Sequence, residues 1–170
     1  ISAGAATTIS LTLAAGADSV NVHFPAAQSG VTLTVSDTTA SDTLGGVTSS
    51  GVNINASALD SLEFVMTSPQ RDNLPVTGTN TITARDFYQN VITGFDASTD
   101  NVTVTGTGAG TVTITGLGSG NNNVLNQASD FVNGVADLTA QGMTANVTAT
   151  GAYIFTATSA SAITGQTDTV

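Results

Sequence analysis

Apolar and polar residues alternate strictly in several short segments of the chain. The alternating segments are 8–13, 19–24, 31–35, 62–66, 101–105 and 111–115. A period of two places one side of a strand on a core and leaves Thr, Ser and Asn facing solvent. Turn-rich sequences such as SDTTASDTLGG and GLGSGNNN lie between these segments. Many short strands with regular turns predict an all-β protein, built as a sandwich or a barrel.

One segment has a different pattern. From Val124, apolar residues recur at spacings of four, three, four and three, as on one face of a helix, and nearby asparagines can cap it. Gly134 interrupts this stripe, and the sequence FVNGVADLTA also fits two short strands around an Asn-Gly turn. The periodicity therefore leaves helix and strand open for residues 124–138.

A stretch that begins at Thr81, TITARDFYQNVITGF, resembles the recurring segment of bacterial Ig-like repeat domains, the invasin/intimin-like modules of large cell-surface proteins. In that family a strand ending in Ala-x-Asp precedes a turn, and a short strand then ends in Gly and an aromatic residue. The positions that carry the resemblance are Ala84, Asp86, Asn90, Gly94 and Phe95. Gln89 stands where the family usually has glycine.

Other pieces of the chain resemble further strands of these modules, in the same order. They are LDSLEFVMTSPQ, DFVNGVADLT and GAYIFTATSASAITGQTDTV, so that the resemblance covers residues 59–170. The likeness of DFVNGVADLT to a family strand favours strands over a helix in that segment. The resemblance implies an Ig-like antiparallel β-sandwich with additional N-terminal strands, serving as a spacer, stalk or adhesive unit. It implies an extracellular or cell-surface location and no catalysis.

We therefore expect two parts, an N-terminal β-strand segment at 1–58 and the Ig-like sandwich at 59–170. Fewer than 60 residues without disulfides bury little surface, so the first part is expected to extend the sandwich or to be completed by a neighbouring subunit. A terminal apolar strand is what strand exchange between subunits requires, with pairing inside the chain as the alternative. The residues of this assembly strand are Ile9, Leu11 and Leu13. Because the sequence begins with Ile, we expect a processed chain or a segment of a longer protein.

The amino-acid composition limits the classes of partner that the chain can bind. The chain has two basic residues, Arg71 and Arg85, against twelve acidic ones, and its net charge is −10. Such a chain cannot neutralise a nucleic-acid backbone or bind an anionic membrane surface. No apolar run approaches the ~20 residues that cross a bilayer, so no membrane insertion is expected. The expected partners are identical or repeated subunits, in a homopolymer.

The candidate catalytic residues are few. The chain has no Lys or Cys, which excludes Schiff-base, thiol and zinc–thiolate chemistry. His23 is the single histidine and alternates outward with Asn21 on a predicted strand, with no Ser and Asp tied to it. No group of residues meets the arrangement of nucleophile, base and orienting group, and we expect no enzyme.

Calcium is the one cofactor to consider, and none is otherwise required. Asp96, Asp100 and Asn101 place oxygen atoms at spaced positions of one loop, as hard-cation sites do. The loop lacks the glycine and the final Glu of an EF-hand, and Asp and Asn also favour such turns through their own hydrogen bonds. Asn55, Asn101 and Asn146 begin N-x-S/T sequons and are glycosylation candidates, although a chain rich in Asn and Thr contains such sequons by chance.

Two functions follow. The first is a non-enzymatic structural subunit or repeat of a cell-surface filament, stalk or layer. The second is an adhesin or carbohydrate-binding β-sandwich with a glycan ligand, which needs an exposed aromatic platform. Phe87, Tyr88 and Tyr153 are the candidates for it. With aromatic residues at 5%, mostly Phe, the sequence favours packing of these side chains in the core or at a sandwich corner.

Overall fold

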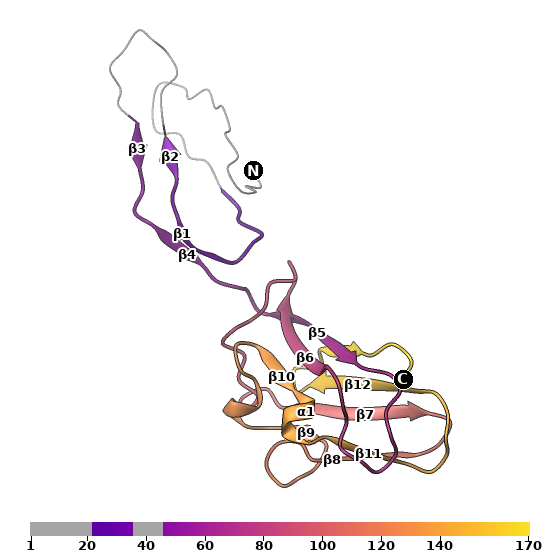
Figure 1. Cartoon of the computed structure of the whole chain (residues 1–170). Helices are drawn as coiled ribbons and strands as arrows, with labels where there is room; N and C mark the ends of the chain where they lie inside the picture. The colour runs from indigo at the N-terminus through magenta and orange to yellow at the C-terminus, as the bar shows by residue number, and fades with distance from the viewer. Residues whose placement is uncertain (1–21, 36–45) are drawn as a thin grey trace. The chain divides into compact units, whose positions relative to one another are not determined.

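The structure is a computed structural model that describes residues 22–35 and 46–170. The chain divides between Ala56 and Ser57 into two units (Figure 1), two residues before the boundary that the sequence predicts. The described residues of both units form antiparallel sheets with little helix. The all-β class predicted from the alternation is confirmed.

The first unit contains two ladders of two strands each in its described residues. These are β1 (Gln28–Val31) with β4 (Val52–Ile54), and β2 (Thr34–Val35) with β3 (Val47–Thr48). Leu33 is 45% exposed and Val35 is 70% exposed, so the prediction that this alternation faces a core is wrong. The reason is that both ladders are only two strands wide, and none of the residues described in this unit is buried.

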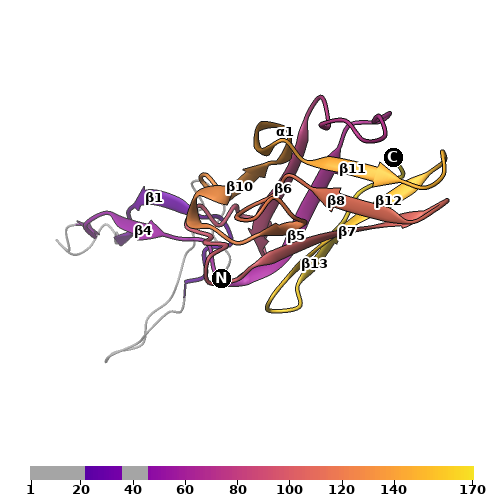
Figure 2. The ribbon, with the colours of Figure 1, turned by 90° about the horizontal axis from the view of Figure 1, so that it is seen from below.

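The second unit, residues 57–170, contains three antiparallel sheets (Figures 1 and 2). Its strands are β5 (Leu59–Met66), β6 (Asn80–Asp86), β7 (Val102–Gly108), β8 (Val112–Thr115), β9 (Val124–Leu125), β10 (Val135–Asp137), β11 (Thr144–Val147), β12 (Tyr153–Ser159) and β13 (Thr164–Gln166). The strand orders are β10-β6-β5 in one sheet, β13-β12-β7-β9 in the second and β11-β8 in the third. Buried side chains from all three sheets form one core, as in a β-sandwich.

The predicted alternation is confirmed in this unit. Leu62 and Phe64 of β5 are buried, as are Val102 and Val104 of β7, while the residues between them are exposed or half-buried. β6 differs, because one of its sides is fully buried and Thr83 on the other side is buried as well. It lies between β5 and β10, and the short helix α1 (Leu138–Gln141) also packs on it.

The segment 124–138 forms two short strands, β9 and β10, with a 3₁₀ turn at Ala128–Asp130 between them, and not the continuous helix that its spacing allowed. Only its last residue, Leu138, belongs to α1. Asn133 and Gly134 both have positive φ, 51° and 80°, and Val132 pairs with Val135 across them. The Asn-Gly turn between two short strands is therefore present, because these residue types tolerate the left-handed conformation that a tight hairpin requires. Helix α1 has four residues, and the described part of the chain contains no helix that is long and apolar enough to cross a membrane.

The two larger sheets approach each other most closely where β13 packs on β5. At Gly165 of β13 the backbone lies directly against the backbone of Leu62, and a Cβ atom at position 165 would overlap the Leu62 carbonyl oxygen. Only glycine fits between the two strands at this point. A side chain at position 165 would therefore force β13 and β5 apart.

We expect Gly165→Ala to lower the free energy of unfolding by about 1–3 kcal/mol, because the two strands must separate to admit the methyl group. Gly94→Ala is the matched control. A Cβ at position 94 meets no atom within 4 Å, and the substitution should change stability by less than about 0.5 kcal/mol. Urea unfolding followed by circular dichroism measures both. Equal effects of the two substitutions would contradict the close approach.

Candidate functional site

The first candidate site is the turn that follows β6, residues 86–90, here called the aromatic turn. The carboxylate of Asp86 is 1% exposed and holds this turn together. It accepts hydrogen bonds from the backbone N–H groups of Tyr88 and Asn90, each at 2.9 Å, and from the side-chain amide of Asn90 at 3.0 Å. It also accepts the backbone N–H of Ser57 at 2.9 Å, which ties the residues that precede β5 to the same carboxylate.

These hydrogen bonds decide the ionisation of Asp86. Burial of the carboxyl group raises its pKa, but the hydrogen bonds from the Asn90 side chain and from the backbone of Ser57, Asn90 and Tyr88 outweigh burial and lower the pKa below its ordinary value. The carboxylate is therefore ionised at neutral pH, and its charge is stabilised by N–H donors. A charged acceptor makes these hydrogen bonds stronger than neutral ones.

A hydrogen bond from the Arg85 side chain also stabilises the aromatic turn. Gln89 has a φ of 65°, in the region that glycine usually occupies. Its carbonyl accepts a hydrogen bond from an Arg85 terminal nitrogen at 2.8 Å. The same guanidinium pairs with Glu63 of β5, with 2.8 Å between Nε and the carboxylate. Arg85 thus stabilises a backbone conformation that a non-glycine residue adopts only at a cost.

The turn presents two aromatic side chains to solvent. Phe87 is 69% exposed and Tyr88 is 44% exposed. Their ring centroids are 5.2 Å apart and the ring planes meet at 89°, an edge-to-face arrangement. The prediction that these two residues pack in the core or at a corner is wrong, because the hydrogen bonds of Asp86 turn their backbone outward at the end of β6.

Tyr153, the third aromatic candidate, lies at a corner of the sandwich. It is buried at the start of β12, and its hydroxyl donates a hydrogen bond to the backbone carbonyl of Ala149 at 2.6 Å. For this residue the corner packing expected from the sequence is correct. The hydrogen bond fixes the turn by which the chain enters β12.

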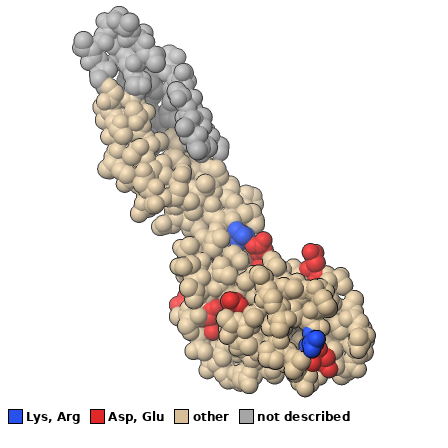
Figure 3. Space-filling model, in the orientation of Figure 1, with Lys and Arg blue, Asp and Glu red and all other residues tan. Residues whose placement is uncertain are grey.

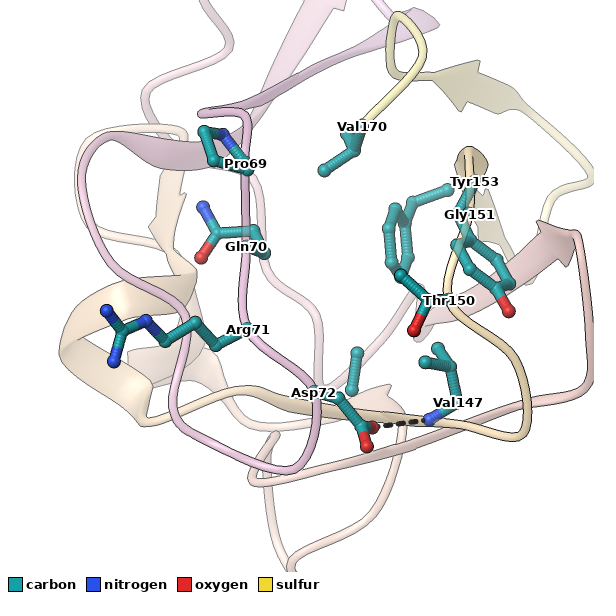
Figure 4. Close-up of a pocket in the computed structure, with 11 residues that line it drawn as sticks. Pro69, Gln70, Arg71, Asp72, Val147, Thr150, Gly151, Tyr153 and Val170 are labelled. Atoms are coloured by element: carbon teal, nitrogen blue, oxygen red, sulfur yellow. Dashed lines mark hydrogen bonds between the residues drawn. The ribbon is translucent and has the colours of Figure 1, made fainter.

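The second candidate site is a cavity of about 300 Å³, here called the groove. It lies between the loop that joins β5 to β6, the connection from β11 to β12, and the segment that ends at Val170 (Figure 4). Its lining is mostly apolar and includes Val147, Tyr153, Phe155 and Val170. The charged residues of the lining are Arg71 and Asp72, and the Asp72 carboxylate accepts the backbone N–H of Val147 at 2.8 Å.

The loop on one side of the groove is held by amide side chains. Asn80 is fully buried at the start of β6, and its side chain accepts the backbone N–H of Thr67 at 2.9 Å and donates to the hydroxyl of Thr139 at 2.8 Å. Gln70 accepts the backbone N–H of Thr77 at 2.9 Å and donates to the Thr77 carbonyl at 2.9 Å. These contacts fix residues 67–80, so this wall of the groove is formed before any partner binds.

The residues predicted to bind calcium already accept hydrogen bonds from backbone N–H groups. The Asp96 carboxylate accepts the backbone N–H of Ser98 at 2.8 Å, and hydrogen bonds from Ser98 lower the pKa of Asp96. The Asp100 carboxylate accepts the backbone N–H of Ser161 at 2.9 Å, and the Asn101 carbonyl accepts the N–H of Ala160. Among the described residues, three or more acidic or histidine side chains do not gather into a group suited to a metal ion. Calcium binding stays a prediction.

The remaining candidates are spread over the chain. The sequon residues Asn55, Asn101 and Asn146 are exposed, and Asn146 lies within β11. His23 is exposed in a single β-bridge of the first unit. The assembly strand with Ile9, Leu11 and Leu13 lies outside the described residues.

Phe87 and Tyr88 are recognisable as candidates in the sequence, whereas the groove is not. The groove joins residues 69–72, 145–155 and 170, which are far apart in the sequence and are brought together by the sheet topology. Two prolines bracket the RDN sequence and are typical of a loop, but they give no indication of what packs opposite it.

Comparisons with protein families, with curated proteins and with solved structures found no match. The resemblance to invasin/intimin-like repeats accordingly stays a prediction based on short sequence motifs.

We expect Asp86→Asn to lower the free energy of unfolding at neutral pH by about 1.5–3 kcal/mol, because hydrogen bonds to a charged acceptor are replaced by bonds to a neutral amide. The pKa of Asp86 is lower in the folded chain than in the unfolded one, so its contribution is complete above the unfolded pKa and is lost as the pH falls through the folded pKa. Urea unfolding between neutral and strongly acidic pH should therefore show a shallower loss of stability for Asp86→Asn than for the wild type.

Asp96→Asn is the matched control for that substitution, because its carboxylate caps a more exposed turn. It should cost less stability than Asp86→Asn. An equal or larger cost would contradict the anchoring role given to Asp86.

Proposed function

We propose that the chain is a non-enzymatic structural subunit or repeat of an extracellular filament, stalk or layer, built on an Ig-like sandwich. The observation that carries this proposal is the strand order. The order β10-β6-β5 facing β13-β12-β7 corresponds to strands E-B-A facing G-F-C of an immunoglobulin-type sandwich. The tyrosine corner at the start of strand F in such domains has a counterpart in Tyr153 and Ala149.

The surface of the second unit supports a role in assembly. Outward positions on its strands are mostly Thr, Ser and Asn, and the space-filling view has few charged atoms among many uncharged ones (Figure 3). Charged side chains, Lys above all, commonly prevent association between exposed strand edges. A sandwich with few of them is suited to side-by-side or end-to-end contacts with other copies.

The acidic residues support a structural role for the same unit. Asp72, Asp86, Asp96, Asp100 and Asp137 each accept a backbone N–H group, at the turns, corners and helix start where strands change direction. These carboxylates fix the backbone where the strands end. A building block that is repeated in an assembly needs such a constant shape.

Net charge predicts how such an assembly responds to salt. At −10 per chain, copies repel one another at low ionic strength, and raising the salt from about 0.01 M to about 1 M shortens the Debye length from about 30 Å to about 3 Å. We expect the average mass in sedimentation velocity to rise with NaCl, and with CaCl₂ at matched ionic strength. Circular dichroism at each salt concentration controls for unfolding. A folded chain that remains monomeric in both salts would overturn the proposal.

An adhesin or carbohydrate-binding function is the second candidate, and the exposure of Phe87 and Tyr88 favours it. Aromatic faces bind the apolar faces of sugars, and a turn held by Asp86 and Arg85 presents both rings at little cost in conformational entropy. The extracellular location and the glycan ligand are both part of this second proposal.

For this second function we expect selective binding on a glycan array that is lost in Tyr88→Ala. Val65→Ala is the control, because Val65 is also 44% exposed but lies on β5, away from the turn. Binding that survives Tyr88→Ala, or that is absent from the wild type, would exclude the aromatic turn as a glycan site.

A further inference from the structure

The hairpin turn before β10 contains the one Asn-Gly pair of the sequence, Asn133–Gly134. Val132 and Val135 close this turn, because the backbone N–H of each donates to the carbonyl of the other, at 2.9 and 3.1 Å. The N–H of Gly134 takes no part in these two hydrogen bonds. Asn133 is exposed, and Val132 is 66% exposed. Water therefore has access to the tip of the hairpin.

The fold itself favours this pair of residues. Gly134 has a φ of 80°, and a Cβ atom there would lie 2.5 Å from the carbonyl oxygen of Ile92. The conformation and the close approach both restrict this position to glycine. Asn133 has a φ of 51°, which asparagine, aspartate and glycine tolerate better than other residues do. The turn is thus built from the pair in which an asparagine is chemically least stable.

Asparagine before glycine is prone to deamidation, a reaction whose only other reactant is water. The backbone nitrogen of the glycine attacks Cγ of the asparagine, the Cγ–Nδ2 bond breaks, and ammonia leaves with the proton of the backbone nitrogen. The product is a cyclic imide. Water then adds to one of its two carbonyl carbons and opens the ring to aspartate or to isoaspartate. Glycine favours the attack, because without a Cβ its backbone is mobile and its nitrogen is unhindered.

We propose that Asn133 is a site of deamidation and that the hairpin keeps its native form with only one of the two products. Aspartate leaves the main chain unchanged, and Asp-Gly is, like Asn-Gly, a preferred sequence for such a turn. In isoaspartate the main chain passes through the former side chain and is longer by one methylene group. This inference goes beyond the proposed function and does not rest on it, since the reaction involves a single chain.

Ring closure requires the hairpin to open. Gly134 is buried against the backbone of Ile92, so its nitrogen is held in place while the turn is closed. The neighbouring strand β10 is an edge strand and pairs with β6 over three residues. So short a ladder at the edge of a sheet opens at a low free-energy cost. The reaction therefore proceeds from a locally opened hairpin.

A longer main chain is incompatible with the hydrogen bonds of this turn. Val132 and Val135 pair directly across its two residues, and the Gly134 carbonyl accepts the backbone N–H of Ala84 at 2.9 Å, beside the β10–β6 ladder. With an extra methylene group these contacts cannot all form. We therefore expect isoaspartate to detach β10 and to expose the backbone groups of β6 that β10 now covers.

The first measurement follows deamidation of the full chain during storage in mildly alkaline buffer, by digestion and mass spectrometry of the peptides. Asn73 and Asn121 are matched internal controls, because both are exposed with a positive φ, 56° and 52°, and neither precedes glycine. Asn133 should react at least about tenfold faster than either, a difference of about 1.4 kcal/mol in activation free energy. Labelling by an isoaspartyl methyltransferase identifies the isoaspartate product.

The second measurement is hydrogen exchange of the stored chain, read separately for the peptides of the two products. Residues 134–137 should exchange at least about tenfold faster in the isoaspartate form than in the unreacted chain, whereas the aspartate form should match the unreacted chain. Asn133→Asp is the control for the aspartate form, and its midpoint of thermal unfolding should equal that of the wild type. Asn133→Gly keeps the left-handed turn and lacks the reactive amide, so storage should leave its exchange unchanged.

Four results would overturn the inference. Deamidation at Asn133 no faster than at Asn73 and Asn121 would show that the turn prevents the reaction. Isoaspartate with wild-type protection of residues 134–137 would show that the turn accepts both products. Loss of that protection in fresh Asn133→Asp would show that it accepts neither. An equal loss in stored Asn133→Gly would assign the change to another process.

Discussion

The sandwich of residues 57–170 depends on hydrogen bonds from backbone N–H groups to side-chain oxygens at its turns. Strand pairing satisfies the backbone inside the sheets, but each turn leaves donors that need another partner. Asp86, Asp130 and Asp137 supply acceptors after β6, before β10 and at the start of α1. Asn80 does the same where β6 begins. Without disulfides, these short contacts are what keeps long turn regions in one conformation.

The same contacts connect the fold to both candidate sites. Asp86 shapes the turn that exposes Phe87 and Tyr88, and Asp72 and Asn80 hold the two sides of the loop that lines the groove. The acidic residues therefore act through the backbone, and the surfaces that they create are apolar. A chain organised in this way is suited to contacts by shape and burial, and this is the basis on which we propose assembly with other copies.

Sequence reasoning was most accurate where a second layer covers the strands. In β5 and β7 the alternation predicted the buried positions, because the opposite sheet packs on them. At Leu33 and Val35 the same alternation failed, because a two-stranded ladder has no such layer in the described residues. The alternation along a strand predicts which residues share a side. Whether that side is buried depends on the elements that pack against it.

By itself, the alternation of apolar residues with Thr, Ser and Asn determined that this is an all-β chain, and the shortage of cations restricted its partners. These properties follow from local preference and from composition. Tertiary structure alone decided that Gly165 must fit against Leu62, that Phe87 and Tyr88 face outward, and that the groove forms. The close approach at Gly165 and the groove depend on backbone segments distant in the sequence meeting within a few ångströms, which no local pattern encodes, whereas the outward turn of Phe87 and Tyr88 depends on the burial of Asp86 at the end of β6.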